Sequence, residues 1–413
     1  MNPRINISRL CYVSEQSALR EGDSIFVSQY LFRRIRYPSM FFPLVTLALP
    51  RAEGKRLRED SSRVAISRFE NMRIHFLPAP RRRPIRWLMQ WWALRDPIRE
   101  ADAVCVNIPE ESGFLAALIC RMLKKPLLVQ VLGDWKNAVL FGGRPGIART
   151  VKSWLGDWMA RTAVRSATLV FAQGRALFDQ CRAINPRATR SDMVHSTVTE
   201  EEFFERPTIE FHEPLRILTV CRLEPGKGLE VLARSIRTLL EDGLKVEWWC
   251  VGQGPSERSL QGLAESLGIS ECVKFAGYVP HGPKLFEFYR QADIFVLPSF
   301  HEGIPNVILE AMAHSMPIVA TDVGSVCQVI TNGVEGVLTP PGETRLLAKA
   351  IRRLANDWVG ARLMGNAAFL KARGYRADSF SSLHRRLIET AFGTLNTVPP
   401  FDDNAAAAQS AQS

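Results

Sequence analysis

Residues 292–324 read ADIFVLPSFHEGIPNVILEAMAHSMPIVATDVG and place two short apolar runs around a longer amphipathic one. The runs 294–297 and 317–320 each predict a buried strand. The segment between them predicts a helix over 306–314, because Pro305 suits the start of a first helical turn. A strand, a helix and a second strand in this order form a unit in which the two strands lie parallel.

The same alternation extends through the rest of the 413-residue chain, whose length suits two domains. Further strands are expected at 10–14, 103–108, 127–132, 168–172, 216–220, 246–251 and 273–276. Further helices are expected at 24–35, 113–123, 147–166, 176–184, 229–240, 258–267, 285–291 and 380–392. The pattern therefore predicts α/β domains, each built on a doubly wound parallel sheet.

The chain divides near the acidic, proline-containing segment 200–214. We expect an N-terminal Rossmann-like domain over residues 1–205 and a C-terminal one over 214–374, facing each other across a cleft. A last helix within 376–395 is expected to pack back on the N-terminal domain. Residues 396–413 show no apolar periodicity and end in Ala, Gln and Ser, which predicts a disordered tail.

Positive charge is concentrated in the first half of the chain. Residues 1–210 carry 33 Lys and Arg against 21 Asp and Glu, whereas the remainder carries 20 against 21. The net charges are therefore +12 and −1. An anionic partner is expected to meet the first half of the chain.

Composition excludes several classes of protein. No run of about 18 uncharged apolar residues is present, so no membrane-spanning helix is expected. No apolar stretch follows residues 1–6, so no signal peptide is expected. The eight cysteines are not spaced as metal ligands or redox pairs, and most lie in apolar runs. They predict reduced core thiols in a cytoplasmic protein.

Charged side chains and glycines follow the expected strands of the C-terminal domain, where ligands bind in parallel α/β sheets. Turn formation explains several of the glycines but not the cations Arg222 and Lys227 or the carboxylates Glu302 and Glu310. A glycine-flanked loop that enters a helix offers free N–H groups to an anion. An Arg fork and a Lys charge beside such a loop predict a diphosphate site.

Glu302 and Glu310 are separated by seven residues, with Glu302 on a loop and Glu310 about one turn into the expected helix. Carboxylate oxygens at this place accept hydrogen bonds from sugar hydroxyls. The spacing equally suits a structural role, in which Glu310 stabilises the dipole of its own helix. Spacing alone leaves both interpretations open.

Five runs resemble the signature of glycosyltransferase family 4 (group 1) of the GT-B fold superfamily: residues 222–228, 292–299, 302–313, 317–324 and 333–336. The likeness covers residues 215–356 closely, whereas the first half is similar to the family only in its order of strands and helices. The resemblance implies the GT-B fold, with two Rossmann-like domains facing across a cleft. This fold agrees with the domain organisation expected from the pattern.

The resemblance implies a retaining transfer of sugar from a nucleotide-sugar donor, with no metal or other cofactor. Arg222 and Lys227 would hold the donor diphosphate and stabilise its developing charge. Glu302 would contact the transferred sugar, and Glu310 would bind the ribose hydroxyls. Backbone N–H groups of the run Gly303, Ile304, Pro305 and Asn306 would bond the sugar or the β-phosphate. The remaining donor-binding candidates are Gly252, Gly277 and Gly22.

One position departs from the family pattern. The family commonly places a His near the sugar at the end of a first-domain strand, whereas the corresponding run 129–135 reads VQVLGDW. Either Asp134 makes that catalytic contact, or the position is not essential in this chain. Asp134 equally suits an ordinary turn residue after Gly133.

Two segments of the basic first half mix Arg with aromatic residues, 30–37 and 81–92. If the second is helical from Pro84, one stripe contains Ile85, Leu88, Met89 and Trp92, with Trp87 and Trp91 beside it. Ile85, Leu88 and Met89 are expected to pack on the sheet, with a solvated Arg cluster at the start of the helix. Clustered Arg and Trp also suit an anionic membrane surface. No nucleic-acid partner is expected, because no nucleic-acid-binding motif is present.

Together these features predict a retaining glycosyltransferase that moves a sugar from a nucleotide-sugar to a glycan or lipid-linked acceptor. Its expected pathway is the biosynthesis of a surface polysaccharide: exopolysaccharide, capsule or lipopolysaccharide. The expected location is the cytoplasm, with peripheral binding to the cytosolic face of the inner membrane as an extension. The alternatives are a GT-B-fold epimerase or phosphorylase, and a non-catalytic scaffold relative.

Overall fold

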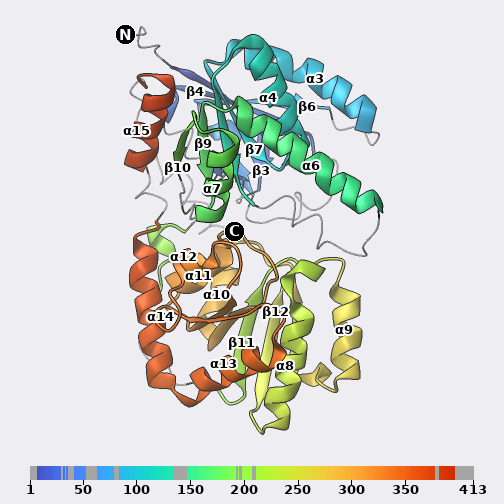
Figure 1. The fold of residues 1–413 in the computed structure, drawn as a ribbon, viewed down its shortest axis with the longest axis vertical. Helices are drawn as coiled ribbons and strands as arrows, with labels where there is room; N and C mark the ends of the chain where they lie inside the picture. Colours follow the sequence, from blue (N-terminus) through green and yellow to red (C-terminus); the bar gives the residue numbers. More distant parts are fainter. Residues whose placement is uncertain are drawn as a thin grey trace.

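The chain contains two parallel sheets, one in each half of the sequence (Figure 1). The computed structural model describes residues 7–28, 31–32, 34–35, 41–52, 63–78, 83–133, 147–191, 194, 198–206, 211–376 and 381–395. The expected tail over 396–413 lies outside the described residues, as does Asp134.

The N-terminal sheet has seven parallel strands in the order β10-β9-β8-β7-β1-β4-β6. In chain order they are β1 (Arg9–Val13), β4 (Leu44–Pro50), β6 (Met72–Leu77), β7 (Ala103–Ile108), β8 (Leu127–Val131), β9 (Leu169–Ala172) and β10 (Thr189–Ser191). The chain reverses its direction of travel across this sheet between β1 and β7. In such sheets the carboxyl ends of the two strands at the reversal form the ligand crevice.

The C-terminal sheet has six parallel strands in the order β13-β12-β11-β14-β15-β16. They are β11 (Leu215–Val220), β12 (Val246–Val251), β13 (Val273–Gly277), β14 (Ile294–Leu297), β15 (Ile318–Thr321) and β16 (Val337–Thr339). Here the reversal lies between β11 and β14. The doubly wound α/β prediction is therefore confirmed for both halves of the chain.

Helices cover both faces of each sheet. On the first sheet, one face carries α3 (Arg83–Glu100), α4 (Glu111–Leu123), α6 (Ile147–Ser166) and α7 (Arg175–Ile184). On the second sheet, one face carries α8 (Leu229–Glu241), α9 (Glu257–Ser266) and α13 (Thr344–Asn356), and the other carries α10 (Pro283–Gln291), α11 (Asn306–Ala313) and α12 (Val326–Val329). Helix α14 (Trp358–Arg373) contributes to both of these cores.

The two cores of each domain follow from the period of two in a strand. In β1, Cys11 and Val13 enter the core under α3 and α4, whereas Leu10 and Tyr12 enter the core on the opposite face. Both sets are buried, so β1 is buried on both faces from Leu10 to Val13, and only Arg9 at its start is exposed. Strands of this kind require a helix layer on each side.

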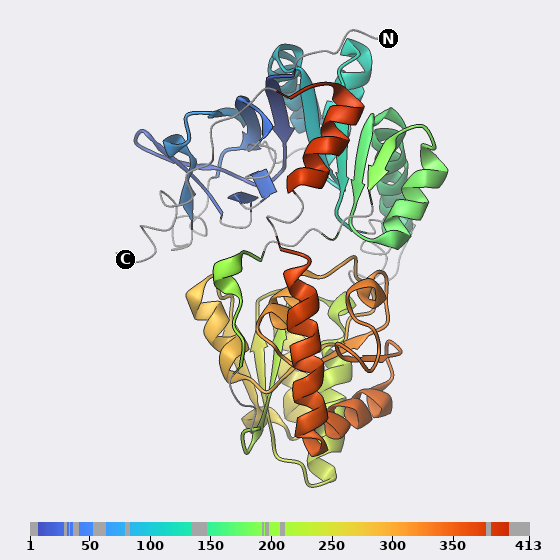
Figure 2. The ribbon, with the colours of Figure 1, turned by 90° about the vertical axis from the view of Figure 1, so that its left-hand side faces the viewer.

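The last helix, α15 (Ser381–Phe392), lies on the N-terminal sheet although it follows the C-terminal domain in the sequence (Figure 2). Ile388 and Phe392 are buried in the same core as Leu10 and Tyr12. Leu395 then forms a bridge with Ile7. The chain therefore crosses between the domains twice, once before β11 and once before α15.

The two domains meet at the carboxyl ends of their strands. Gln173, which follows β9, donates its side-chain amide to the carbonyl of Ile304 at 2.7 Å. The backbone of Gly303 approaches the end of β8, where a Cβ added to it would lie 3.5 Å from the carbonyl oxygen of Leu132. These contacts bring the ligand-binding edges of both sheets together.

One expected helix is wrong at its start. Residues 24–27, assigned to a helix over 24–35, form strand β3 (Ser24–Val27), which pairs with β2 (Leu19–Glu21) and β5 (Val64–Ala65) in a small antiparallel sheet. Glu21 pairs directly with Ser24, which leaves a two-residue turn with Gly22 at a φ of +59°. A glycine at positive φ favours such a tight hairpin and ends the helical interpretation.

The packing expected for Ile85, Leu88 and Met89 of α3 is also wrong. Ile85, Leu88, Met89 and Trp92 are exposed, and the helix packs through its other side. That other side consists of Trp87, Trp91, Leu94 and Ile98. The helix has apolar residues on two faces, and its own sequence does not specify which one meets the sheet.

The cysteines are free thiols, five of them buried, two half-buried and one, Cys327, exposed. None of the described helices is long and apolar enough to cross a membrane.

Candidate active site

The site lies at the reversal of the C-terminal sheet, where loops follow β11 and β14. These strands are neighbours, with Leu218 opposite Phe295, so the loops after them leave the sheet side by side. The N–H of Phe300 donates to the carbonyl of Gly226 at 3.0 Å and joins the two loops. Residues about 75 positions apart in the sequence therefore converge at one sheet edge.

Glycines permit this close packing of loop backbones. Gly252, which follows β12, has a φ of +139°, and a Cβ added to it would lie 1.8 Å from the carbonyl oxygen of Cys221. Its N–H donates to the carbonyl of Gly277 at 2.7 Å, which places these two candidate glycines together. At Gly228 an added Cβ would lie 2.1 Å from the carbonyl oxygen of Pro298. A side chain at these positions would push the loops apart.

Lys227 and Glu302 form an ion pair, with 2.7 Å between Nζ and Oε1. The hydroxyl of Ser299 donates to the same carboxylate oxygen at 2.7 Å. Both charged side chains are largely buried, at 16% and 10% exposed. An ammonium group has three donors, so Lys227 retains capacity for the oxygens of an anionic ligand while it holds Glu302.

Arg222 lies on the same loop but is not part of that pair. Its side chain is 80% exposed, and its guanidinium contacts Glu224 at 3.0 Å. Burial raises the pKa of the neighbouring Cys221 thiol to about 12, and the charges of Lys227, Glu302 and Arg222 all act on that thiol. All three charged residues follow β11 or β14 at the same sheet edge, and Arg222 is exposed to solvent.

Glu310 is a buried carboxylate in the second turn of α11. One oxygen accepts from the hydroxyl of Tyr289 at 2.8 Å, and the other lies 3.3 Å from Nδ1 of His281. Burial would raise the pKa of this carboxyl, but His281 and Tyr289 outweigh burial and hold the pKa below its usual value. The carboxylate is thus bound by groups from α10 and the loop before it.

His281 connects Glu310 to the segment that joins the domains. Its Nε2 lies 3.1 Å from Oε1 of Glu202, in the short helix η2 (Glu200–Glu202). Glu202 also accepts from the N–H of Thr199, at the start of that helix. Three side chains in contact, Glu202, His281 and Glu310, therefore connect the interdomain segment to helix α11.

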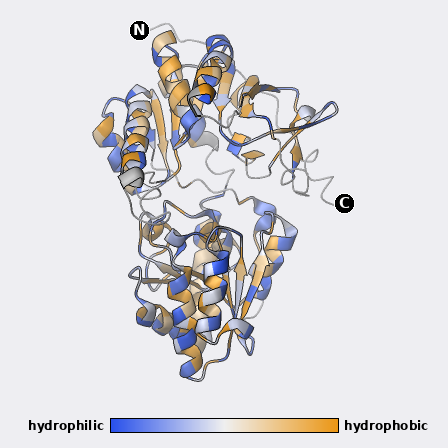
Figure 3. Cartoon of the chain, turned by 90° about the vertical axis from the view of Figure 1, so that its right-hand side faces the viewer, coloured by the Kyte–Doolittle hydropathy of each residue, from blue (hydrophilic) through white to orange (hydrophobic). Residues whose placement is uncertain are grey.

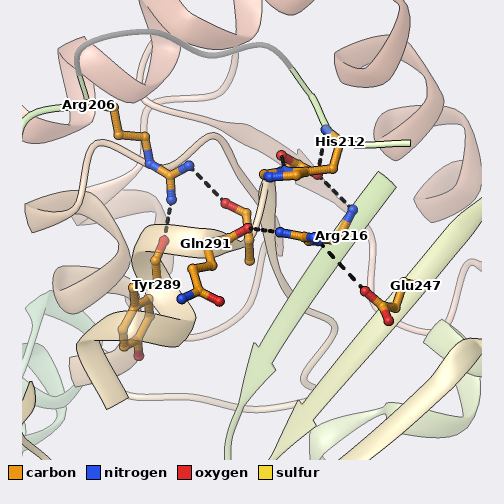
Figure 4. Close-up of polar contacts among 8 residues, drawn as sticks. Arg206, His212, Arg216, Glu247, Tyr289 and Gln291 are labelled. Carbon is orange, nitrogen blue, oxygen red and sulfur yellow. Dashed lines mark hydrogen bonds and ion pairs between the residues drawn. The ribbon is translucent and has the colours of Figure 1, made fainter. Parts of the chain in front are cut away.

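The interdomain segment is anchored by a buried arginine, Arg206 (Figure 4). The guanidinium of Arg206 donates to the carbonyls of His314 at 3.0 Å and Ala292 at 2.8 Å, and also to the carbonyl of Tyr289. These bonds fix the end of α10, which carries the tyrosine that binds Glu310.

The loop 303–306 leads into α11, whose first N–H groups have no partner within the helix. The side-chain oxygen of Asn306 is buried without a hydrogen-bond partner among the described residues. A buried acceptor of this kind is costly unless a donor reaches it. It therefore marks a place where a hydroxyl or amide of a ligand would be bound.

Gly22 does not belong to the site. It lies exposed at the tip of the β2–β3 hairpin, with open space around its Cα. The remaining candidates of the C-terminal domain gather at one edge, at the ends of β11 to β14. Within the described residues, no group of three or more His, Cys, Asp or Glu side chains is placed to hold a metal ion.

Sequence reasoning missed an acidic group at the reversal of the N-terminal sheet. Glu110 follows β7, and its carboxylate accepts from the N–H of Glu15 at 2.7 Å and from the hydroxyl of Ser14 at 3.2 Å, both after β1. Burial raises the pKa of the Glu110 carboxyl to about 7. The neighbouring strands β1 and β7 could have indicated it, since the reversal of a parallel sheet is where ligands bind.

Comparisons with known proteins find a matching family model and similar chains. The family model described as "Glycosyl transferases group 1" matches residues 214–357. The amylovoran biosynthesis glycosyltransferase AmsK of Erwinia amylovora is 31% identical over 45% of this chain and 49% of its own. The chain therefore spans about half the length of that relative.

Two solved structures resemble the whole chain. The Anabaena protein HepE, solved in complex with UDP, has a TM-score of 0.69 and 17% identity over 93% of this chain and 100% of its own. The sucrose-phosphate synthase of Thermosynechococcus elongatus has a TM-score of 0.73 and 16% identity over 93% and 99%. Both likenesses concern the fold, which is the GT-B fold. Residues 214–357 are therefore similar to the group 1 glycosyl transferases.

Proposed function

We propose that this protein is a retaining glycosyltransferase of family 4, which transfers a sugar from a nucleotide-sugar to a glycan or lipid-linked acceptor. The observation that carries the proposal is the contact between Lys227 and Glu302 at the edge that faces the other domain. A cation for phosphate and a carboxylate for sugar hydroxyls thus lie side by side. AmsK by its name acts in amylovoran biosynthesis, which supports surface polysaccharide as the product class.

Each donor residue has a part set by its position. Lys227 and the exposed Arg222 bind the diphosphate and neutralise the charge that develops on it as the sugar leaves. Glu302 orients the sugar, and Asn306 with the first N–H groups of α11 bonds the sugar or the β-phosphate. Glu310, fixed by His281 and Tyr289, accepts from the ribose hydroxyls. HepE, which shares the fold, has been solved with UDP and with UDP-glucose, and this supports a nucleotide-sugar donor.

The acceptor enters from the N-terminal domain in this proposal. Glu110, Glu15 and Ser14 lie at the reversal of that sheet, just after the carboxyl ends of β1 and β7. A carboxyl with a pKa of about 7 is suited to bind or deprotonate an acceptor hydroxyl. The proposed location is cytoplasmic and peripheral, on the cytosolic face of the inner membrane.

The transfer is proposed to need no divalent cation, because Arg222 and Lys227 supply positive charge at the diphosphate. Turnover should therefore persist in excess chelator. A loss of turnover in chelator that magnesium or manganese restores would contradict this part of the proposal.

A nucleotide-release screen tests the function as a whole. The intact protein is incubated with UDP-, GDP-, ADP- and dTDP-sugars, with and without short glycan acceptors. We expect release from one nucleotide class, and nuclear magnetic resonance should show that the anomeric configuration is retained in the product. Failure of every donor to bind or react would overturn the proposal, and inversion would overturn the retaining mechanism.

The substitution Lys227→Met should abolish most of that release. Lys245→Met is the matched control. Lys245 also forms an ion pair, with Glu213 at 2.8 Å, but both of these side chains are highly exposed. Equal loss of release in both variants would show that the effect is not specific to the site.

A further inference from the structure

We infer that the outward sides of α3 and α6 form a membrane-docking face that binds an anionic bilayer beside the acceptor side of the cleft. This outer apolar face consists of Ile85, Leu88, Met89 and Trp92 of α3 with Val151, Trp154 and Trp158 of α6. The inference gives a surface to the peripheral location proposed above. It does not require that sugar transfer take place.

Helix α3 exposes one complete apolar stripe. Its four members are 45% to 62% exposed and lie at positions i, i+3, i+4 and i+7, so they project from one side of the helix. The opposite side packs on the core through Trp87, Trp91, Leu94 and Ile98. The exposed stripe therefore contributes nothing to that core, and water must cover it unless a partner does.

Helix α6 repeats the arrangement. Val151, Trp154 and Trp158 are 44% to 69% exposed and lie at positions i, i+3 and i+7. The ring of Trp158 stands 5.2 Å from that of Phe114 in α4, and Phe114 stands 6.3 Å from Trp87 in α3. Helix α4 thus joins α3 and α6 in a single layer, as Figure 1 also shows.

The exposed charged side chains of α3, α4 and α6 are mainly positive. The exposed basic residues of the described side chains are Arg95, Arg99, Arg121, Lys152 and Arg165, and the exposed acidic ones are Asp96 and Glu100. Hydrophilic residues accompany the hydrophobic ones on the helices of this domain in the side view of Figure 3. The guanidinium of Arg95 lies 5.7 Å from the centre of the Trp92 ring. Trp flanked by Arg and Lys is the composition that favours the headgroup region of an anionic membrane.

The connectivity places this face next to the cleft. A helix that follows a parallel strand begins at the carboxyl end of that strand. The residues after β8 and β9 at this edge contact Gly303 and Ile304 of the other domain. The first described turns of α6, which follows β8, therefore lie toward the cleft, with Val151 and Trp154 on them. A bilayer docked there would present lipid-linked acceptors to the N-terminal side of the site.

Vesicle co-sedimentation tests the inference on the intact protein. Vesicles of phosphatidylcholine with and without 30% phosphatidylglycerol (about one third anionic) are compared at low and high salt. We expect wild type to bind the anionic vesicles and to lose much of that binding as salt screens the basic side chains. The triple variant Leu88→Gln, Trp92→Gln and Trp154→Gln should reduce the vesicle partition coefficient at least about tenfold, since each side chain would otherwise be buried in the interface.

The matched control is Leu363→Gln with Leu370→Gln. These leucines are 65% and 67% exposed on α14 of the other domain, so they share the chemistry but not the position. The control should bind vesicles as wild type does. Thermal melts and binding of nucleoside diphosphate, measured without vesicles, should be unchanged in all variants, which separates this inference from the proposed transfer function.

Three results would overturn the inference. The first is wild-type protein that does not bind anionic vesicles, and the second is a triple variant that binds them as fully as wild type. The third is a concentration-dependent dimer, detected by sedimentation velocity without lipid, that the triple variant abolishes. In that case the outer apolar face would be covered by a second copy of the chain.

Discussion

Of the two members of the Lys227–Glu302 pair, only Lys227 should be required for diphosphate binding. Lys227→Met removes the cation that a phosphate oxygen would contact. One charge-assisted hydrogen bond contributes about 1.5–3 kcal/mol, so the dissociation constant of the nucleoside diphosphate should rise about 10- to 150-fold. Glu302→Gln removes the carboxylate that shares the same ammonium at 2.7 Å. The diphosphate should then bind as tightly as to wild type, or more tightly.

Turnover should separate the two variants further. Glu302→Gln retains the cation but loses the carboxylate that contacts the sugar, so its turnover should fall at least about tenfold while diphosphate binding is kept. Isothermal titration measures binding of the nucleoside diphosphate, and nucleotide release measures turnover. Lys245→Met and Glu213→Gln are the controls, because they break an ion pair whose side chains are 74% and 76% exposed.

Folding must be checked, since Lys227→Met leaves Glu302 largely buried without its cation. The double variant Lys227→Met with Glu302→Gln removes both charges. It should recover any thermal stability lost by Lys227→Met but not the diphosphate affinity. Weaker binding in Glu302→Gln, by the same factor as in Lys227→Met, would refute the separate roles of the two side chains.

Three further predictions concern other parts of the chain. Glu310→Gln and His281→Gln should each weaken binding of a nucleoside diphosphate about tenfold more than binding of inorganic pyrophosphate, because pyrophosphate lacks a ribose. Titrations in which both ligands are weakened equally would contradict a ribose contact. The pKa of Glu110 is raised to about 7, so the folded state holds its proton more tightly and wild type should lose up to roughly 3 kcal/mol of unfolding free energy between pH 5 and 8. The unfolding free energy of Glu110→Gln, measured in urea, should not show that loss. If it fell with pH in parallel with that of wild type, Glu110 would not be its cause. Gly252→Ala should destabilise the fold by more than about 2 kcal/mol, because the added Cβ would lie 1.8 Å from a carbonyl oxygen. Gly262→Ala, in open space within α9, should be neutral or stabilising. Equal melting temperatures of the two variants would refute the close approach at Gly252.

The strands and helices around the site could be predicted from local pattern. Strand β14, helix α11 and strand β15 lie within one residue of the expected ranges, because buried strands and amphipathic helices each have their own apolar period. The helix expected over 24–35 begins after the turn at 21–23, whereas residues 24–27 form strand β3. The small sheet in which it pairs forms through β5, which lies about 40 residues further along the chain.

The residue types of the donor site were also readable, because a diphosphate needs cations and a sugar needs carboxylates. For Gly22, the residue type alone does not distinguish a hairpin turn from a phosphate loop, and the structure places it in the β2–β3 hairpin. His281, Tyr289, Glu202 and Glu110 carry no local signal. They are recognised only when the fold brings their separate elements together.

Helix α3 separates the two kinds of information. Its sequence establishes that the helix is apolar on two sides, because residues three and four apart share a face. Which side is buried depends on the sheet and on α4, which pack against Trp87, Trp91 and Leu94 and leave Leu88 and Trp92 exposed. Likewise, residue types predict a cation and a carboxylate, but only the adjacency of β11 and β14 brings Lys227 to Glu302. Periodicity is a property of neighbours in the chain, whereas burial and contact are properties of neighbours in space.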